Sequence, residues 1–214
     1  MNVVVLISGS GSNLQSLIDN STSPDIRLCA VFSNKKSAFG LKRAGNAGIP
    51  AHVIDPKKFA DREACDRELM RQIDRYDPGL VVLAGFMRVL SPVFVQHFSG
   101  RLLNIHPSLL PKFRGLHTHQ RVLQAGDTEH GCSIHFVSDE LDSGPLIAQA
   151  CVPVYDKDDE TTLSARVQAR EHKLYPLVIG WFCSGRLRTH DGQVFLDDEP
   201  LVRPVVYAQN EDIK

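Results

Sequence analysis

The sequence predicts an α/β fold in which helices cover both faces of a doubly wound, mostly parallel sheet. Three observations support this prediction. Short β-branched runs alternate with helical patterns over the first hundred or so residues. Two of these runs, VVVLI at Val3–Ile7 and LVVLA at Leu80–Ala84, are apolar throughout, as expected for strands that are buried on both faces. The 214 residues are 43% apolar, which is enough for a large core without metals or disulfides.

The expected elements follow one another without repeats or an obvious linker. Strands are predicted at Val3–Ile7, Leu28–Phe32, Ala51–Ile54, Leu80–Ala84 and Leu102–Ile105, with helices between them at Leu14–Asp19, Ala38–Ala47, Arg62–Asp74 and Pro92–His97. After Gly115 the pattern predicts a helix at His117–Ala125, strands at Ser133–Val137 and Leu146–Pro153, and a helix at Thr161–Cys183 with an apolar stripe. A hairpin is expected at Arg186–Thr189 and Gln193–Leu196, within one domain spanning 1–214.

Composition and charge argue against several classes of protein. The net charge is -1, with Lys and Arg scattered, so no nucleic-acid partner is expected. No apolar run approaches the ~20 residues of a membrane helix, so no membrane partner is expected. The five cysteines are widely spaced, and Met1 leads into a strand without a signal peptide. We therefore expect a cytoplasmic protein with reduced thiols, an unused glycosylation sequon at Asn20, and a fraying polar end at Glu211–Lys214.

The first candidate site is the glycine-serine loop, Ser8–Asn13, between the first strand and the first helix. Free backbone N–H groups at a helix start favour an anion, and glycines let the backbone approach it closely. Leu14 stands where a dinucleotide fingerprint needs a small residue, and the Lys-Ser/Thr ending of a P-loop is absent. The loop is therefore typical of a site for a single phosphate, with a simple capped turn as the alternative.

The second candidate pairs Asn104 with His106 at the end of the fifth strand. Residues two apart in a strand project from the same face, and the carboxyl ends of strands are where open α/β sheets bind ligands. An amide donor beside an imidazole can stabilise an oxyanion and supply a proton. The alternative is that His106 has only a structural role.

The third candidate is Asp142 in the acidic loop, Asp139–Pro145. A carboxylate near His106 would favour the charged imidazolium. The alternative is a solvated surface turn.

The fourth is Glu171, which lies on the apolar stripe of the long helix with Gln168 nearby. A core-facing acid must be paired or line a cavity, unless it reaches solvent at the edge of the stripe.

Metal binding and cysteine catalysis are not expected. Five residues come under consideration as metal ligands, but their spacings match no zinc motif: His117, His119, His130, Cys132 and His135. No cysteine lies in a motif that would depress its pKa.

Five segments together resemble the phosphoribosylglycinamide formyltransferase family of purine synthesis: VVLISGSGSNLQSLID, VVLAGFMRVLSP, NIHPSLLPKFRGLHTH, HGCSIHFVSDELDSGP and ARVQAREHKLYPLVIGWF. The resemblance implies a Rossmann-like sheet of seven strands and a cis peptide at Leu110–Pro111. It also implies a phosphate-binding half over about 1–100 and a folate-binding and catalytic half over about 101–190. At positions 113 and 114 this sequence has Phe-Arg, where members of the family frequently have Tyr-Pro.

The resemblance also implies transfer of a formyl group from 10-formyltetrahydrofolate to the amine of phosphoribosylglycinamide by direct attack, without a metal. The implied catalytic residues are Asn104, His106 and Asp142. Residues implied to bind the phosphorylated substrate are Gly11, Ser12, Asn13, Leu14, Gln15, Gln168 and Glu171. Residues implied to bind the folate are Arg62, Met87, Arg88, Val89, Leu90, Asn104, Val137, Asp139, Glu140 and Leu141.

Two classes of alternative stay open from the sequence. The first is another folate formyl enzyme: a tRNA or sugar-nucleotide formyltransferase, or a formyl-folate hydrolase. The tRNA enzyme would add a basic C-terminal barrel, for which we expect no room, and the hydrolase would carry a domain before the first strand. A non-catalytic phosphate-binding module would leave Asn104 and His106 without a purpose. The oligomeric state is expected to be a monomer or a homodimer.

Overall fold

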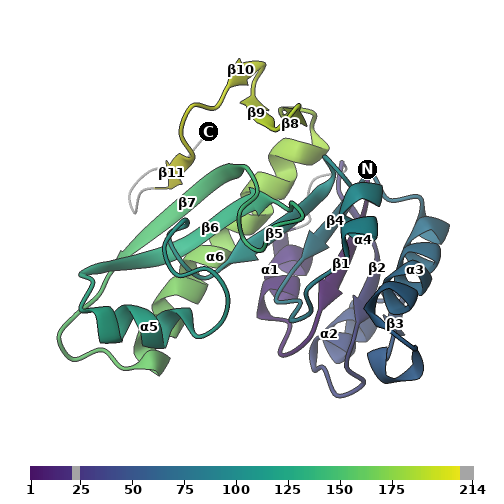
Figure 1. Ribbon diagram of the computed structural model, residues 1–214, viewed down its shortest axis with the longest axis horizontal. Coiled ribbons are helices and arrows are strands. Elements are labelled where there is room, and N and C mark those ends of the chain that lie inside the picture. Colours follow the sequence, from purple (N-terminus) through teal and green to yellow (C-terminus); the bar gives the residue numbers. More distant parts are fainter. Residues whose placement is uncertain (21–24, 208–214) are drawn as a thin grey trace.

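The computed structural model describes residues 1–20 and 25–207. Most of the Asn20 sequon and all of Glu211–Lys214 lie outside these residues. Within them, the main sheet has eight strands in the order β11-β7-β6-β5-β4-β1-β2-β3 (Figure 1). Their bounds are β1 Asn2–Ile7, β2 Arg27–Ser33, β3 Ala51–Val53, β4 Leu80–Leu83, β5 Leu102–His106, β6 Glu129–Phe136, β7 Leu146–Pro153 and β11 Val205–Tyr207.

The main sheet is mostly parallel, as predicted. Strands β3, β2, β1, β4 and β5 pair in parallel, and β6 is antiparallel to both β5 and β7. The seven expected strands are all present. The eighth, β11, is a three-residue Val-Val-Tyr run that pairs in parallel with β7, and a run this short gave no pattern to predict it from.

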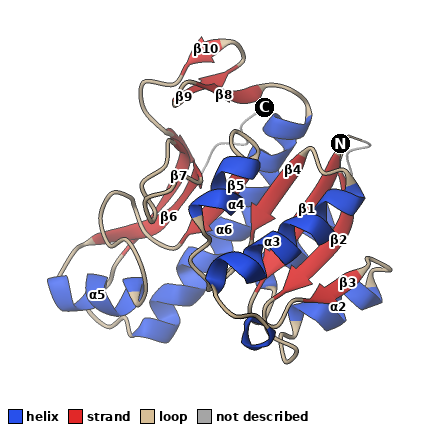
Figure 2. Ribbon diagram, turned by 45° about the vertical axis from the view of Figure 1, so that its right-hand side comes forward, coloured by secondary structure: helices blue, strands red, loops and turns tan. Residues whose placement is uncertain are grey.

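Helices cover both faces of the sheet, with bounds of α1 Ser12–Asn20, α2 Gly40–Asn46, α3 Arg62–Ile73, α4 Pro92–His97, α5 Thr118–Ala125 and α6 Glu160–Cys183. Alternate residues of β1 enter different cores: Val5 packs with α1, α2 and α6, whereas Val4 packs with α3 and α4. Figure 2 shows α3 and α4 in front of the parallel strands, with α6 behind them. This two-sided burial explains why the strand sequences are apolar throughout.

The short segments complete the chain. Two 3-10 turns, η1 Pro56–Lys58 and η2 Asp74–Tyr76, flank α3. The expected C-terminal hairpin forms β8 Leu187–His190 and β9 Gln193–Leu196, and β10 Glu199–Pro200 adds a third strand. The peptide bond between Leu110 and Pro111 is cis, as predicted.

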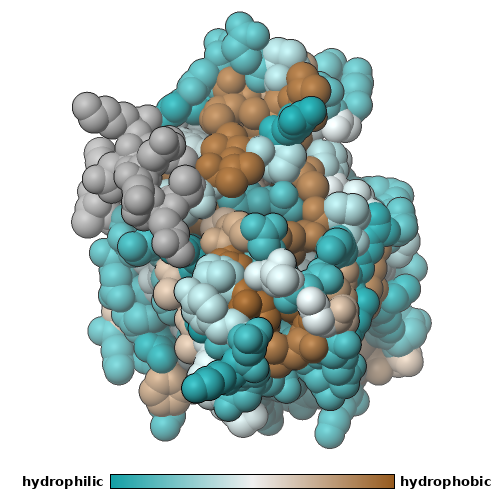
Figure 3. All heavy atoms as spheres, turned by 90° about the vertical axis from the view of Figure 1, so that its left-hand side faces the viewer, coloured by the Kyte–Doolittle hydropathy of each residue, from teal (hydrophilic) through white to brown (hydrophobic). Residues whose placement is uncertain are grey.

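The face of the molecule seen in Figure 3 is mostly hydrophilic, with apolar side chains near its top and in its lower middle. No helix of the described chain has the length and apolar character needed to cross a membrane. All five cysteines are free thiols, as expected, and burial raises the pKa of Cys65 and Cys132.

The topology creates a crevice at one edge of the sheet. The chain leaves β1 toward β2 on one side, and β4 lies on the other side of β1, so the connections diverge above the carboxyl ends of these strands. The long helix α6 is fixed beneath this edge by the buried Tyr175, whose hydroxyl donates to the carbonyls of Leu83 at 2.9 Å and Leu103 at 3.2 Å. The end of β4 and the start of β5 are thereby tied to the helix that forms one wall of the site.

Candidate active site

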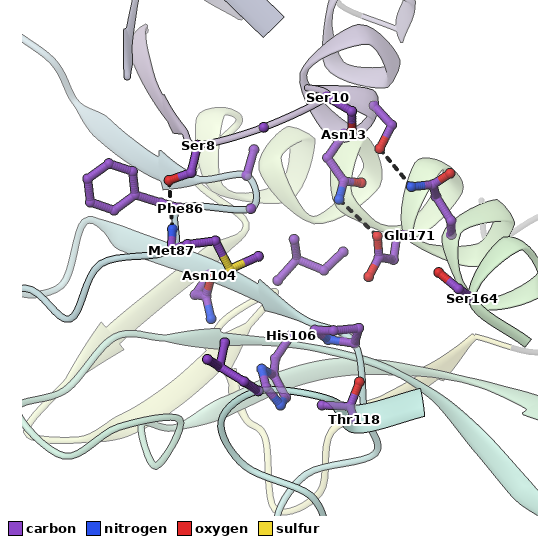
Figure 4. A pocket seen from close by; sticks show the side chains of 18 of the residues that line it. Ser8, Ser10, Asn13, Phe86, Met87, Asn104, His106, Thr118, Ser164 and Glu171 are labelled. Atoms are coloured by element: carbon purple, nitrogen blue, oxygen red, sulfur yellow. Dashed lines mark hydrogen bonds between the residues drawn. The ribbon is translucent and has the colours of Figure 1, made fainter. Parts of the chain in front are cut away.

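A cavity of about 610 Å³ lies at the carboxyl ends of β1, β4 and β5. Its walls are the glycine-serine loop, residues 84–89, the end of β5, residues 115–119 and the first half of α6. In Figure 4, Asn13 and Glu171 lie across the cavity from Asn104 and Met87. A cavity of this size matches the pockets that hold small organic ligands.

The glycine-serine loop approaches its neighbour too closely for a side chain at Gly11. This residue has a φ of +69°, and a Cβ there would lie 2.6 Å from the Cα of Gly40. Beside the loop, Arg43 donates from Nε to the Ser10 carbonyl at 2.9 Å and from its guanidinium to Gln15 at 3.0 Å. The loop thus holds a fixed shape, with α1 beginning at Ser12 and its first N–H groups next to the cavity.

The expected substrate-binding residues divide into two groups. Gly11, Ser12 and Asn13 line the cavity. The Leu14 side chain is fully buried in the core, so only its backbone is available to a ligand. The Gln15 side chain is bonded to Asp19 and Arg43 and is absent from the cavity wall.

Helix α6 presents Gln168 and Glu171 to the same loop. Gln168 Nε2 donates to the Ser12 hydroxyl at 2.8 Å, and Asn13 Nδ2 donates to Glu171 Oε2 at 2.9 Å (Figure 4). Glu171 is 7% exposed, and its burial raises the pKa of the carboxyl, while the bond from Asn13 partly lowers it. Of the two readings of Glu171 from the sequence, the cavity-lining one is correct.

Asn104 and His106 both line the cavity from β5. Asn104 Nδ2 donates to Nε2 of His135 at 3.1 Å, and Nδ1 of that histidine donates to the Phe136 carbonyl at 2.9 Å. The bond fixes which end of the Asn104 amide carries the nitrogen. The second N–H of this amide is a donor that a ligand can use.

His106 has an acceptor at each ring nitrogen. Nδ1 lies 3.4 Å from Oδ2 of Asp142, and Nε2 lies 3.0 Å from the Phe113 carbonyl. Each ring nitrogen, where it carries a proton, can therefore donate to a fixed acceptor. The carboxylate is itself positioned, because Asp142 has a left-handed φ of +49° and accepts from the Gly115 N–H at 2.9 Å. An amide, an imidazole and a carboxylate thus converge on one wall.

The expected folate-binding residues are spread more widely. Met87, Arg88, Val89 and Leu141 line the cavity. Leu90 is 9% exposed and Val137 is partly buried, and both pack in the core under α3 and α4. The remaining three side chains lie exposed outside the cavity wall: Arg62, Asp139 and Glu140. One of them, Glu140, forms an ion pair with Arg114 at 2.9 Å.

Several cavity residues were not among the predicted site residues. One is Phe86, which a quoted segment contained without marking a role. Ser8 belonged to the predicted loop but had no individual role there. His119 of α5 had a place in a quoted segment but was considered only as a metal ligand. Two others come from the start of α6, before the quoted helix segment: Glu160 and Ser164. Only the fold brings these last residues to the cavity. Among the described residues, no three His, Cys, Asp or Glu side chains are grouped to hold a metal ion.

Comparison with known proteins identifies the family to which the chain belongs. Residues 1–179 match the family model described as formyl transferase, which is most of the chain, so the chain belongs to the formyl transferase family. It is 58% identical over 213 residues to the phosphoribosylglycinamide formyltransferase of Escherichia coli (strain K12), covering 99% of this chain and 100% of that protein.

Two further relatives support the same branch of the family. The phosphoribosylglycinamide formyltransferase structure from Coxiella burnetii has a TM-score of 0.93 at 51% identity, covering 97% of this chain and 99% of that one. The human trifunctional purine biosynthetic protein adenosine-3 is 44% identical over 188 residues, covering 87% of this chain and 19% of that protein. These similarities confirm the family resemblance predicted from the motifs.

Proposed function

We propose that the chain transfers a formyl group from 10-formyltetrahydrofolate to the amine of 5'-phosphoribosylglycinamide, in purine biosynthesis in the cytoplasm. The observation that carries the proposal is the convergence of Asn104, His106 and Asp142 in a cavity between an anion-binding loop and the 87–90 segment. Relatives of similar length carry the name of this activity. The protein acts as a monomer or a homodimer.

The phosphorylated substrate binds on the α1 side of the cavity. Its phosphate accepts from backbone N–H groups of Gly11, Ser12, Asn13 and Leu14, where the helix start favours negative charge. Gln168 adds a donor, and Glu171 accepts from the ribose or glycinamide end. Gln15 supports this side by holding Arg43 against the loop.

The folate binds on the opposite side, against Met87, Arg88, Val89 and Leu90. The acidic loop covers it with Asp139, Glu140 and Leu141, and Val137 supports the floor. Arg62 lies exposed outside the cavity. Its flexible, charged side chain pairs there with the carboxylate tail of the folate, which extends toward solvent. Both reactants are then held with the formyl carbon near β5.

The reaction is direct attack of the substrate amine on the formyl carbon. The carbonyl oxygen becomes an oxyanion, which accepts from the Asn104 amide and the His106 imidazolium. Nε2 of His106 already donates to the Phe113 carbonyl. Its N–H therefore either divides between that carbonyl and the oxyanion or leaves the carbonyl for the oxyanion. Asp142 keeps the ring charged, and a water at Asp142 carries a proton from the attacking amine to N10 of the folate as the C–N10 bond breaks.

The test is a formyl-transfer assay with both substrates. We expect turnover that depends on phosphoribosylglycinamide, with a loss of roughly 100-fold or more in His106→Ala and in Asp142→Ala. Exposed His190→Ala is the matched control and should retain activity. Folate deformylation without the acceptor would favour a hydrolase, and near-normal turnover in either site variant would refute the roles proposed for these residues.

A further inference from the structure

The 87–90 segment receives almost no support from backbone pairing. Among the described residues, no backbone-to-backbone hydrogen bond outside the helices and strands involves residues 85–90. The strand β4 ends before this stretch and α4 begins after it. The shape of the cavity wall here must therefore be maintained by side chains from other elements.

Two side chains from other elements contact residues 87–91. From the glycine-serine loop, the Ser8 hydroxyl accepts from the Met87 N–H at 2.8 Å (Figure 4). From α3, behind the wall, the Asp66 carboxylate reaches two points. Its Oδ1 lies 3.0 Å from the guanidinium of Arg88, and its Oδ2 accepts from the Ser91 N–H at 2.7 Å.

Asp66 is completely buried, and the Arg88 side chain is 13% exposed. The Asp66–Arg88 contact is an ion pair rather than an aligned hydrogen bond, since Oδ1 has no hydrogen-bond partner. A buried carboxylate without a counter-charge is strongly unfavourable, so Asp66 and Arg88 constrain each other far more than an exposed pair would. The Asp66 carboxylate thereby contacts both ends of the stretch from Arg88 to Ser91, through the Arg88 guanidinium and the Ser91 N–H.

We propose that Asp66 is a positioning residue for the formyl donor: it sets the conformation of the 87–90 segment, and through that segment the affinity for the folate. This inference rests on the proposed function. Asp66 has no contact with the cavity, because it lies behind Arg88 and is absent from the lining. The phosphate side of the site has separate supports in Arg43, Gln168 and Glu171. Loss of Asp66 should therefore affect one substrate and not the other.

The test is steady-state kinetics of Asp66→Asn with each substrate varied in turn. We expect KM for 10-formyltetrahydrofolate to rise roughly 10-fold, KM for phosphoribosylglycinamide to stay within about two-fold, and kcat to change little. Glu63→Gln is the matched control, because it removes an exposed ion pair with Arg67 on the same helix. The control should leave both KM values unchanged.

A second variant keeps the proposal testable if Asp66→Asn does not fold. Ser91→Pro removes the N–H that donates to Asp66 without changing either charge, and the φ of Ser91, -75°, suits proline. We expect the same selective rise in the donor KM, by roughly 3-fold. Equal rises in both KM values, or an unchanged donor KM in the folded variants, would overturn the role of Asp66. No transfer by the unmodified protein would instead refute the proposed function and this assignment with it.

Discussion

At the scale of single residues, His135 determines how the Asn104 amide is oriented. Burial lowers the pKa of His135, which favours the neutral ring. Because Nδ1 donates to the Phe136 carbonyl, Nε2 of the neutral ring is left as an acceptor, and it faces Asn104 Nδ2. From the sequence, His135 had been considered only as a metal ligand. Its contacts instead indicate a role in holding the proposed oxyanion donor.

Replacing His135 should therefore reduce turnover more than binding. His135→Leu removes the acceptor, so we expect kcat to fall roughly 10-fold with both KM values within about two-fold. His135→Gln keeps an oxygen that can accept from Asn104 and should retain more activity than the leucine variant. Steady-state kinetics of the two variants checks this, and equal losses in both would contradict the proposed orientation role.

At the scale of elements, α6 contains a proline that another helix compensates. Pro176 has no N–H, so the carbonyl of His172, four residues earlier, lacks its helical donor. The Ser16 hydroxyl of α1 donates to that carbonyl at 2.6 Å, and Ser16 is 7% exposed. The α1–α6 contact thus includes a hydrogen bond that exists because of the proline. The same two helices carry Asn13 and Glu171, so this contact also supports the cavity.

A double-mutant cycle can measure this compensation. Ser16→Ala leaves the His172 carbonyl unsatisfied and should lower the free energy of unfolding by about 1–3 kcal/mol. In a Pro176→Ala background the helix supplies its own N–H to that carbonyl, and the cost of Ser16→Ala should fall to about half or less. Urea unfolding of the four proteins provides the comparison. Equal costs in the two backgrounds would show that Ser16 does not compensate for the proline.

At the scale of the whole molecule, histidines that are buried or partly buried link folding to pH. Nδ1 of His119 lies 3.0 Å from Nε2 of His130, and burial lowers the pKa of both rings. For His130 the value falls from 6.5 to about 4, with the nearby His119 as the next cause. Burial also lowers the pKa of His135 and His172. Below about pH 6.5, these histidines therefore bind more protons in the unfolded chain than in the folded chain.

The sign of the resulting pH dependence follows from these shifts. The stability associated with neutral His130 is fully present above pH 6.5 and is lost as the pH falls through this range toward about 4. The largest contribution of one histidine to the slope is about 1.4 kcal/mol per pH unit. We expect His130→Gln to show a shallower decline in the free energy of unfolding than the unmodified protein between these pH values. Urea unfolding at several pH values measures the free energy of unfolding of both proteins. An equal decline with pH in the two proteins would contradict the contribution assigned to His130.

Much of the fold was predictable because its signals are local. The apolar runs of β1 and β4 and the stripe of α6 depend on burial patterns that recur within a few residues. Boundaries were less certain: His117, predicted inside a helix, is instead the left-handed residue before α5. The three-residue strand β11 and the two-residue strand β10 carry too few residues to show a period.

The candidate site was partly predictable for the same reason. Asn104 and His106 share a strand face, and Gly11 belongs to a loop with a known backbone requirement. No such signal marked Asp66, the contact of Ser8 with Met87, or the contact of His135 with Asn104, since a buried acid on α3 or a serine after a strand has many structural uses. Their partners lie 25, 79 and 31 residues away in the chain.

By itself, the sequence determined the α/β class, the order of the main strands and helices, the family, and the residue types at the glycine-serine loop and the end of β5. These depend on periodicity and on motifs within short segments, where the chain geometry is nearly fixed. Only the tertiary structure decided that Asp142 lies 3.4 Å from His106, that Asp66 supports the 87–90 segment, and that Leu14 turns into the core. Distances between residues far apart in the chain depend on how all the layers pack at once, and no local pattern contains that information.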